Sequence, residues 1–530
     1  MNSSYKQKTM KYINKILALT ILSTTPAIVM AQKGKEAEEN TPAALEIQKA
    51  KSLWMQTNNA AGLQLDDPLT YTRIALGYDT QNGNLKKPQQ GKKVENISFD
   101  TEGSTFLQSV YLWGSFKYNR QNIDDSGYNA SLIDPYRGMP YYTVDTLQSY
   151  WNNQFYTLQM KGATKPLWNL VSFGLDIQYQ TASGAKQRDP RSENHQYFIN
   201  VKPGVVFSIT PRHHIGLNLQ YSNYKEESSM GNANTYVDQT YYLLYGLGTS
   251  VKKVGSGRFS KYNANTIGGG LQYNYLGSSK LLWDANYSMK VEDLKENSTS
   301  PKNDGTTRDG VFTTNLRLFT NPDNAYSSYI SLGYNDRRIS GIEYITTWNN
   351  STEDTGWVIQ YKGVRSKYKT QIASAQYDLV KNRGGEYSWK LGAILNYTKQ
   401  RDKYLLPESR MESERLEYGA NAKFNIALSE KQVKRLLIAA SATYNNGMSG
   451  VYEYNGQHPE YPVVTDLMQS EFNYSISDYA RFNLSATYSQ QLSEANKSNL
   501  FIKGSFTYDK AYSFDYNHRS LVHIGIGYEF

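Results

Sequence analysis

Residues 283–292 read WDANYSMKVE, and in this stretch apolar or small side chains alternate with polar ones. Successive side chains of a β-strand point to opposite faces, so the pattern predicts a strand with one apolar and one polar face. The same alternation recurs in residues 480–489 and, in shorter form, in residues 312–318 and 422–428. The chain therefore contains repeated amphipathic strands.

The length of these strands indicates the class of fold. The clearest stretches run to ten residues or more, whereas strands of globular proteins average about 5–6 residues. Tyrosines recur near the ends of the apolar faces, which is typical of the aromatic girdles of membrane barrels; they are Tyr118, Tyr287, Tyr397, Tyr488 and Tyr528. We expect an all-β fold, a transmembrane antiparallel up-and-down β-barrel over residues 67–530, with about 18 strands and a range of 14–20. A soluble array of β-sandwiches is the alternative, because half-buried strands also alternate.

Short turns and long polar segments also alternate along the chain. The predicted tight turns are rich in Pro, Gly, Asn, Asp and Ser, which favour turn geometry. They lie at residues 210–212, 277–279, 321–323, 382–385, 429–431 and 477–478. The predicted long loops are residues 120–151, 225–261, 294–309, 339–366, 399–411 and 447–462. If residues 477–478 form a short turn, the last strand lacks an antiparallel partner, so one turn or strand near the C-terminus is misassigned.

Composition excludes several other classes. The chain has 530 residues, a mean hydropathy of −0.65, 13% aromatic residues and no cysteine. A helical membrane bundle needs several apolar runs of about 20 residues, and the only candidate lies at the N-terminus. The absence of cysteine excludes a disulfide scaffold, and the aromatic content argues against a disordered chain.

Residues 1–31 are predicted to be a cleaved secretory signal. Four lysines precede the short apolar core at residues 16–24, and Val29-Met30-Ala31 offers a small-residue cleavage site. A buried first helix is the alternative. Cleavage removes four lysines and no acidic residue, which lowers the net charge from +9 to +5. That charge is too small to favour nucleic acid as a partner.

The C-terminal residues 522–530 read VHIGIGYEF and alternate throughout. Gly525, Tyr528 and Phe530 resemble the terminal assembly signal of Gram-negative outer-membrane barrels. The resemblance implies that the barrel-assembly machinery pairs with this last strand and recognises Phe530, in the manner of β-augmentation. We therefore expect a Gram-negative outer-membrane location, with the lipid bilayer as the permanent partner.

Residues 32–66 form a separate N-terminal segment. Residues 42–56 follow a helical period, with Thr41 as cap and Pro42 in the first turn. Residues 54–63, which contain Trp54, Asn59 and Gly62, resemble the N-terminal hatch of the long-chain fatty-acid transporter family. That resemblance implies a plug that shifts to admit apolar ligands. An ordinary periplasmic cap helix that stops at Gly62 is the alternative.

The mature chain as a whole resembles an uncharacterised family of Gram-negative outer-membrane β-barrels. Besides the segment around residues 53–63, the stretches that carry this resemblance are DPYRG at residues 134–138 and DPR at residues 189–191. The resemblance implies a barrel and no established activity.

Catalytic motifs are absent from the sequence. The six histidines include no His-Glu-x-x-His pattern, and there is no Gly-x-Ser-x-Gly elbow. We expect no catalytic residue, no metal, no cofactor and no enzyme activity. Charged residues are predicted on the lumen face of the strands, where they suit either a water-filled pore or a salt-bridged closed core. They are Lys117, Asp284, Lys290, Glu292, Arg317, Lys390, Lys423, Arg481 and Lys503.

Two functions of different classes follow from this interpretation. The first is transport of solutes across the outer membrane through a polar lumen. The second is a non-conducting accessory or scaffold barrel in a larger outer-membrane transport, assembly or secretion complex. A surface hydrolase is a third and weaker alternative.

Overall fold

The structure, a computed structural model, describes residues 40–255, 257–322, 324–351, 355–430, 433–493 and 497–530. The predicted signal segment, residues 1–31, lies outside this part of the chain. Among the described residues, no helix has the length and apolar character needed to cross a membrane.

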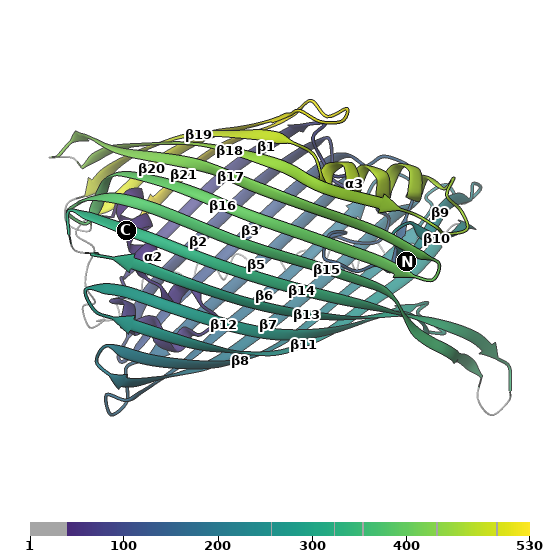
Figure 1. Cartoon of the computed structure of the whole chain (residues 1–530), viewed down its shortest axis with the longest axis horizontal. Helices are drawn as coiled ribbons and strands as arrows, with labels where there is room; N and C mark the ends of the chain where they lie inside the picture. The colour runs from purple at the N-terminus through teal and green to yellow at the C-terminus, as the bar shows by residue number, and fades with distance from the viewer. Residues whose placement is uncertain (1–39, 256, 323, 352–354, 431–432, 494–496) are drawn as a thin grey trace, which may run out of the picture.

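Eighteen strands of the described chain form one antiparallel sheet that closes into a barrel (Figure 1). Each strand pairs with its neighbours along the chain, and β1 (Tyr71–Gly83) pairs with β21 (His518–Glu529) to complete the ring. The others are β2 (Lys93–Leu107), β3 (Val110–Ser126), β5 (Ser149–Thr164), β6 (Val171–Lys186), β7 (Arg191–Thr210), β8 (His213–Gly231), β11 (Gly257–Leu276), β12 (Ser279–Glu296), β13 (Lys302–Thr320), β14 (Tyr326–Asn349), β15 (Gly356–Arg383), β16 (Glu386–Leu405), β17 (Glu408–Ser429), β18 (Lys434–Glu453), β19 (Tyr479–Ser493) and β20 (Ser498–Ala511). The expectation of an up-and-down barrel of about 18 strands is confirmed.

The outer surface of the barrel is apolar. On β12 the outward side chains Tyr287, Met289 and Val291 are 51%, 37% and 39% exposed, whereas Asp284 and Glu292 on the opposite face are buried. Outward side chains that are at least 43% exposed occur all round the ring and include Leu76, Ile97, Leu219, Ile267, Leu332, Leu391, Leu484 and Ile524. Soluble monomers rarely expose apolar patches of this extent. The β-sandwich alternative is therefore wrong, because the apolar faces point outward and not toward a second sheet.

Five of the six predicted tight turns join consecutive barrel strands at one end, which we call the short-turn end. Residues 477–478 do not. They follow α3 (Gln469–Ser475) in the long connection between β18 and β19, at the opposite, long-loop end. The short connection instead joins β19, which ends at Ser493, to β20, which begins at Ser498, and β21 is thereby antiparallel to both of its neighbours.

Four of the predicted long loops are largely strand, and three of them extend barrel hairpins. The fourth, residues 225–261, contains two strands outside the barrel sheet, Gln239–Gly246 and Thr249–Gly255. β14 and β15 remain paired as far as Asn349 and Gly356, and their hairpin projects beyond the barrel (Figure 1). Residues 294–309 and 399–411 likewise continue the β12–β13 and β16–β17 hairpins. Beyond the lipid layer a hairpin needs backbone pairing but no apolar face, so alternation fades and the sequence pattern no longer reveals the strand.

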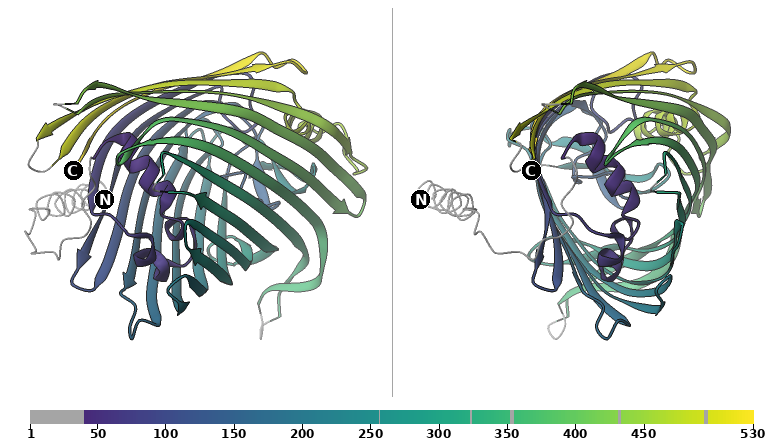
Figure 2. Two further views of the ribbon diagram at one scale, coloured as in Figure 1. Left: turned by 60° about the vertical axis from the view of Figure 1, so that its left-hand side comes forward. Right: turned by 90° about the vertical axis from the view of Figure 1, so that its left-hand side faces the viewer.

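The N-terminal segment lies inside the barrel near the short-turn end (Figure 2). It comprises α2 (Pro42–Lys51) and the 3₁₀ helices η1 (Trp54–Gln56) and η2 (Ala60–Asp66). The predicted cap is confirmed, since the Thr41 hydroxyl accepts a hydrogen bond from the backbone N of Ala44 at 3.2 Å. The helix ends at Lys51 and not at residue 56, because the chain turns there and carries Trp54 into the barrel wall. We call residues 40–66 the plug.

A second folded segment lies at the long-loop end. β4 (Tyr142–Val144), β9 (Gln239–Gly246) and β10 (Thr249–Gly255) form a small sheet. It packs on η3 (Val463–Met468), which leads into α3, through a cluster that includes Tyr242, Leu244, Val464 and Leu467. We call this sheet, η3, α3 and the β3–β5 loop that contains β4 (residues 127–148) the cap.

A charge on the outer face should be costly at the centre of the wall. Leu484 is 58% exposed near the middle of β19. Leu484→Arg should lower the free energy of unfolding from a bilayer by about 2–4 kcal/mol, because arginine at the bilayer midplane carries that cost. Leu492→Arg, on the same face near the short-turn end, is the matched control and should cost about 1 kcal/mol or less. Equal losses measured by urea unfolding in lipid vesicles would contradict a lipid-facing wall.

Candidate functional site

Glu46 fastens α2 to the barrel wall. Its carboxylate accepts hydrogen bonds from Lys390 Nζ at 2.7 Å and Lys423 Nζ at 2.9 Å, and from the Tyr387 hydroxyl at 2.9 Å. Burial opposes ionisation, but the ammonium groups of Lys423 and Lys390 outweigh it and lower the pKa of Glu46 to about 2. The carboxylate is thus charged at any physiological pH, and it pairs with two cations of the wall.

The start of α2 is tied to the same strands. Thr41 donates a hydrogen bond to Glu386, the first residue of β16, while its hydroxyl oxygen caps the helix. The other oxygen of Glu386 accepts from Arg383 and from Arg435, each at 2.9 Å. The first turn of the helix is therefore joined to a charged cluster on β15, β16 and β18.

The second half of the plug is held by close packing. Trp54 is fully buried, and its indole Nε1 donates to Asn274 at 3.1 Å. A Cβ at Gly62 would lie 2.0 Å from the Trp54 ring, so only glycine fits there. The side chain of Asn59 caps η2 through the backbone N of Ala61 at 3.0 Å. It also donates to the carbonyl oxygens of Val205 and Leu217 at 3.1 Å.

Glycines in the wall allow the plug to dock. A Cβ at Gly174 of β6 would lie 2.1 Å from the backbone N of Ala61, and one at Gly204 of β7 would lie 2.1 Å from Asn59 Oδ1. The two strands therefore lack side chains at the positions where η2 meets the sheet. Close approach of two backbones is a recurrent use of glycine within a strand.

Asp66 is a buried carboxyl at the end of the plug. Its Oδ2 accepts from the backbone N of Trp54 at 2.6 Å, whereas Oδ1 has no hydrogen-bond partner among the described residues. Burial raises the pKa of Asp66 to about 7. The docked plug therefore favours the neutral acid.

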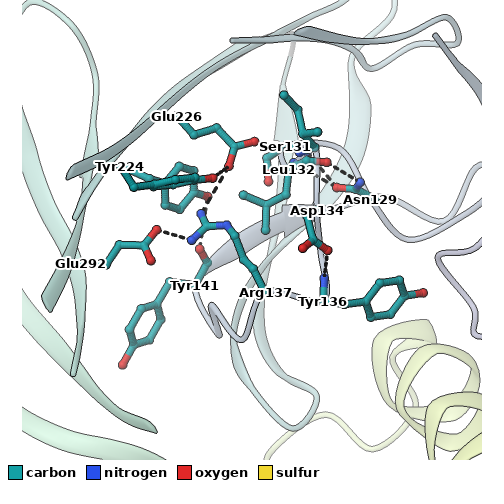
Figure 3. Close-up of polar contacts among 12 residues, drawn as sticks. Asn129, Ser131, Leu132, Asp134, Tyr136, Arg137, Tyr141, Tyr224, Glu226 and Glu292 are labelled. Carbon is teal, nitrogen blue, oxygen red and sulfur yellow. Dashed lines mark hydrogen bonds and ion pairs between the residues drawn. The ribbon is translucent and has the colours of Figure 1, made fainter. Parts of the chain in front are cut away.

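Arg137 anchors the cap from the long-loop end (Figure 3). Its guanidinium pairs with Glu292 and lies 3.5 Å from Glu226, and it sits between the rings of Tyr224 and Tyr262, at 5.1 and 4.8 Å from their centroids. Burial disfavours the charge, but Glu292 outweighs it and raises the pKa of Arg137 above its usual value. The β3–β5 loop thus inserts a permanent cation between wall carboxylates.

Cavities remain between the plug, the cap and the wall. One of 460 Å³ adjoins α2 and is lined in part by Glu46 and Lys390. Another of 380 Å³ lies against β1, β3 and β20 and is lined by Lys117 and Lys503. A third, of 260 Å³, lies beneath the cap. The interior is therefore only partly filled, and its cavities are lined by both apolar and charged side chains.

The family model described as "Family of unknown function (DUF6850)" matches residues 60–530. The chain belongs to this family. The matched span begins inside the plug, at the first residue of η2, and includes the whole barrel and cap. A search of curated proteins gives no match.

Solved structures resemble this DUF6850 chain only distantly. The ferric preacinetobactin receptor BauA from Acinetobacter baumannii is 8% identical over 87% of this chain and 80% of its own, with a TM-score of 0.36. The copper transporter OprC is 9% identical over 87% and 80%, and the RagAB peptide importer is 9% identical over 87% and 86%, each with a TM-score of 0.39. These likenesses assign no solute or partner to the chain. They also give no support to the resemblance to the fatty-acid transporter family.

The nine charges expected in the lumen all lie on the inner face of the DUF6850 barrel. Asp284 pairs with Arg317 at 2.5 Å, Lys290 with Glu292 at 2.9 Å, and Arg481 with Asp509 at 2.7 Å. Lys390 and Lys423 bind Glu46. Lys117 and Lys503 form no hydrogen bond or ion pair with any described residue and face the 380 Å³ cavity. The structure brings Lys390 and Lys423 together at the plug and leaves the other pairs spread around the wall.

Two residues of the expected assembly signal, Gly525 and Tyr528, lie on the closing strand β21, and the third, Phe530, directly follows it. Gly525 pairs with Gly77 of β1, and the backbone of Phe530 exchanges hydrogen bonds with Thr72 at 2.7 and 2.9 Å. The rings of Tyr528 and Phe530 lie 5.5 Å apart. In the closed barrel both edges of β21 are covered, so recognition by an assembly machine stays a prediction about the state before closure.

No cluster of three or more His, Asp or Glu residues suited to a metal occurs in the part of the chain that the structure describes. Sequence reasoning did not single out Glu46, although it is the only acidic residue among residues 41–56. The sequence did contain a signal for this residue, because a single carboxylate on a helix that enters a basic lumen can be expected to pair with lysines of the wall. Arg137 lay within the DPYRG stretch, but its role depends on carboxylates from β8 and β12, which sequence order does not bring together.

Removing the charge of Glu46 should loosen α2. Glu46→Gln replaces charge-assisted hydrogen bonds with neutral ones and removes the carboxylate shared by two partly buried ammonium groups, so amide exchange in residues 42–51 should accelerate roughly 10- to 100-fold. Hydrogen–deuterium exchange of the refolded protein measures this. Glu193→Gln, at the long-loop end of β7 with its side chain 74% exposed, is the matched control. Unchanged exchange in Glu46→Gln would show that packing alone holds the helix.

Docking of the plug should weaken as the pH rises toward 7. A carboxyl whose pKa is raised by folding binds its proton more tightly in the docked state, so docking stability falls between the ordinary value of 3.8 and about 7 and is constant above. Exchange of residues 54–66, corrected for intrinsic rate, should therefore accelerate from pH 4.5 to pH 7.5. Asp66→Asn should abolish this dependence. A wild-type profile that is flat over this range would contradict burial of a neutral Asp66.

Proposed function

We propose that this protein is a gated transport barrel of the Gram-negative outer membrane, which admits solutes through its lumen when the plug moves. The observation that carries the proposal is the attachment of α2. The helix buries only Ala43, Ala44 and Ile47, and is otherwise held by polar contacts of Thr41, Glu46 and Lys49, the last of which pairs with Glu102 of β2. A segment fastened in this way can leave the wall without breaking any strand pairing.

The orientation follows from the two ends of the barrel. In outer-membrane barrels the short turns face the periplasm and the longer loops face the exterior. The plug is then a periplasmic gate and the cap an external one. Insertion through the barrel-assembly machinery and export by a cleaved signal belong to the same proposal, and they are supported by the C-terminal alternation and the N-terminal basic and apolar pattern.

Closure at both ends favours a second candidate, a non-conducting scaffold within a larger outer-membrane transport, assembly or secretion complex. In that case the plug and the cap serve only to fill the lumen. Arg137 and Glu46 would then be structural ion pairs, and their removal would open no path.

Conductance separates the two candidates. In planar bilayers the wild-type barrel should be closed for most of the time, since the plug and the cap both occupy the lumen. Deletion of residues 40–66 should give frequent openings, and addition of Arg137→Ala, which removes the cation that holds the β3–β5 loop, should increase the open fraction further. Heat-modifiable gel migration verifies that each variant is folded. A folded double variant without conductance would exclude transport and favour the scaffold.

A further inference from the structure

The 260 Å³ cavity beneath the cap is walled by elements that are far apart in the sequence. It is bounded by the β1–β2 loop, the β3–β5 loop, the β9–β10 turn, α3 and the outer parts of β14 to β17. Three aromatic rings line it, those of Tyr136, Tyr142 and Tyr368. In Figure 3 the side chain of Tyr136 points away from Arg137 and toward the yellow helix, α3. The cavity is thus distinct from the site that anchors the cap.

The charges around this cavity do not balance. Its charged lining residues are Lys87, Arg337, Asp402 and Glu471. Arg337 is neutralised by Asp309, whose Oδ2 lies 2.7 Å from its Nη2. Neither Asp402 nor Glu471 forms an ion pair with any described residue. Two carboxylates therefore face one ammonium group, that of Lys87, which lies 4.7 Å from the centroid of the Tyr136 ring.

Asp402 is the most informative of these groups. It is 7% exposed, and only Oδ2 has a partner, the amide of Gln400 at 2.5 Å. Oδ1 has no hydrogen-bond partner in the described chain, and neither does the Tyr136 hydroxyl. A buried acceptor without a donor is costly. Because the χ2 torsion of aspartate is broad, either oxygen can turn toward the cavity and accept from a ligand.

We propose that this cavity binds a small organic solute through a primary ammonium group, which donates to Asp402 and Glu471 and lies against the tyrosine rings. Cations are attracted to aromatic faces, and an ammonium also brings the N–H donors that an unpartnered carboxylate needs. The volume suits a solute no larger than a monosaccharide or an amino acid. The inference that such ammonium compounds are the transported solutes rests on the proposed function. Their binding to the cavity does not require conduction.

Two matched pairs of probes test the charge requirement on the full-length refolded protein. Glucosamine differs from glucose, and ethanolammonium from ethylene glycol, by an ammonium in place of a hydroxyl. Calorimetry at pH 7 should show each ammonium probe binding at least tenfold more tightly than its neutral counterpart. If neither ammonium probe binds more tightly, the assignment is overturned.

Substitutions locate the binding. Asp402→Asn should weaken glucosamine binding at least tenfold, and Glu471→Gln should weaken it several-fold, with Glu471→Gln serving as the second variant if Asp402→Asn does not fold. Glu408→Gln removes the same charge at the rim, where the side chain is 65% exposed, and should bind as the wild type does. Folded Asp402→Asn and Glu471→Gln variants that both bind as the wild type does would refute the site.

The binding and conductance measurements can refute the site and the transport function independently of each other. Ammonium binding without any conductance in the plug-deleted barrel would keep the site and refute transport. Conductance without preference for ammonium probes would keep transport and refute the site.

Discussion

Within a lipid layer a backbone N–H or C=O group finds no water, and leaving one unpaired costs several kcal/mol. Closure of the ring by β1 and β21 is the response to this constraint, since it leaves no edge strand in the wall. It also fixes the two faces of every strand. Outward side chains must be apolar, and inward ones are free to be polar because the lumen is shielded from lipid.

A closed polar interior creates a second requirement, which is to balance charges held at low water content. Part of that balance is made within the wall, as in the pair of Asp284 and Arg317. The rest comes from the segments that enter the lumen. Glu46 supplies one negative charge between Lys390 and Lys423, and Arg137 supplies one positive charge between Glu226 and Glu292. The plug and the cap are thus electrostatic complements of the wall. If they move, the wall charges that they leave must be paired by a charged solute or solvated by water.

The two halves of the plug are fastened by different physics. η2 fits against glycines of β6 and β7 with Trp54 fully buried, so its release means loss of close packing. α2 is held mainly by ion pairs and a capped first turn, which water or a charged solute can replace. This difference suits a gate in which α2 moves first, while η2 and Trp54 stay docked.

The sequence by itself determined the barrel, its approximate strand number and the five short turns, because the alternation that a lipid-facing wall requires and the residues that favour tight turns are both local signals. It also predicted the helix cap at Thr41. It could not reveal the strands beyond the lipid layer, because there the apolar face is no longer required. Only the tertiary structure decided that Glu46 meets Lys390 and Lys423, that Arg137 lies between β8 and β12, and that Asp402 and Glu471 share a cavity. These contacts depend on the curvature of the closed barrel, which brings together residues that are far apart in the sequence.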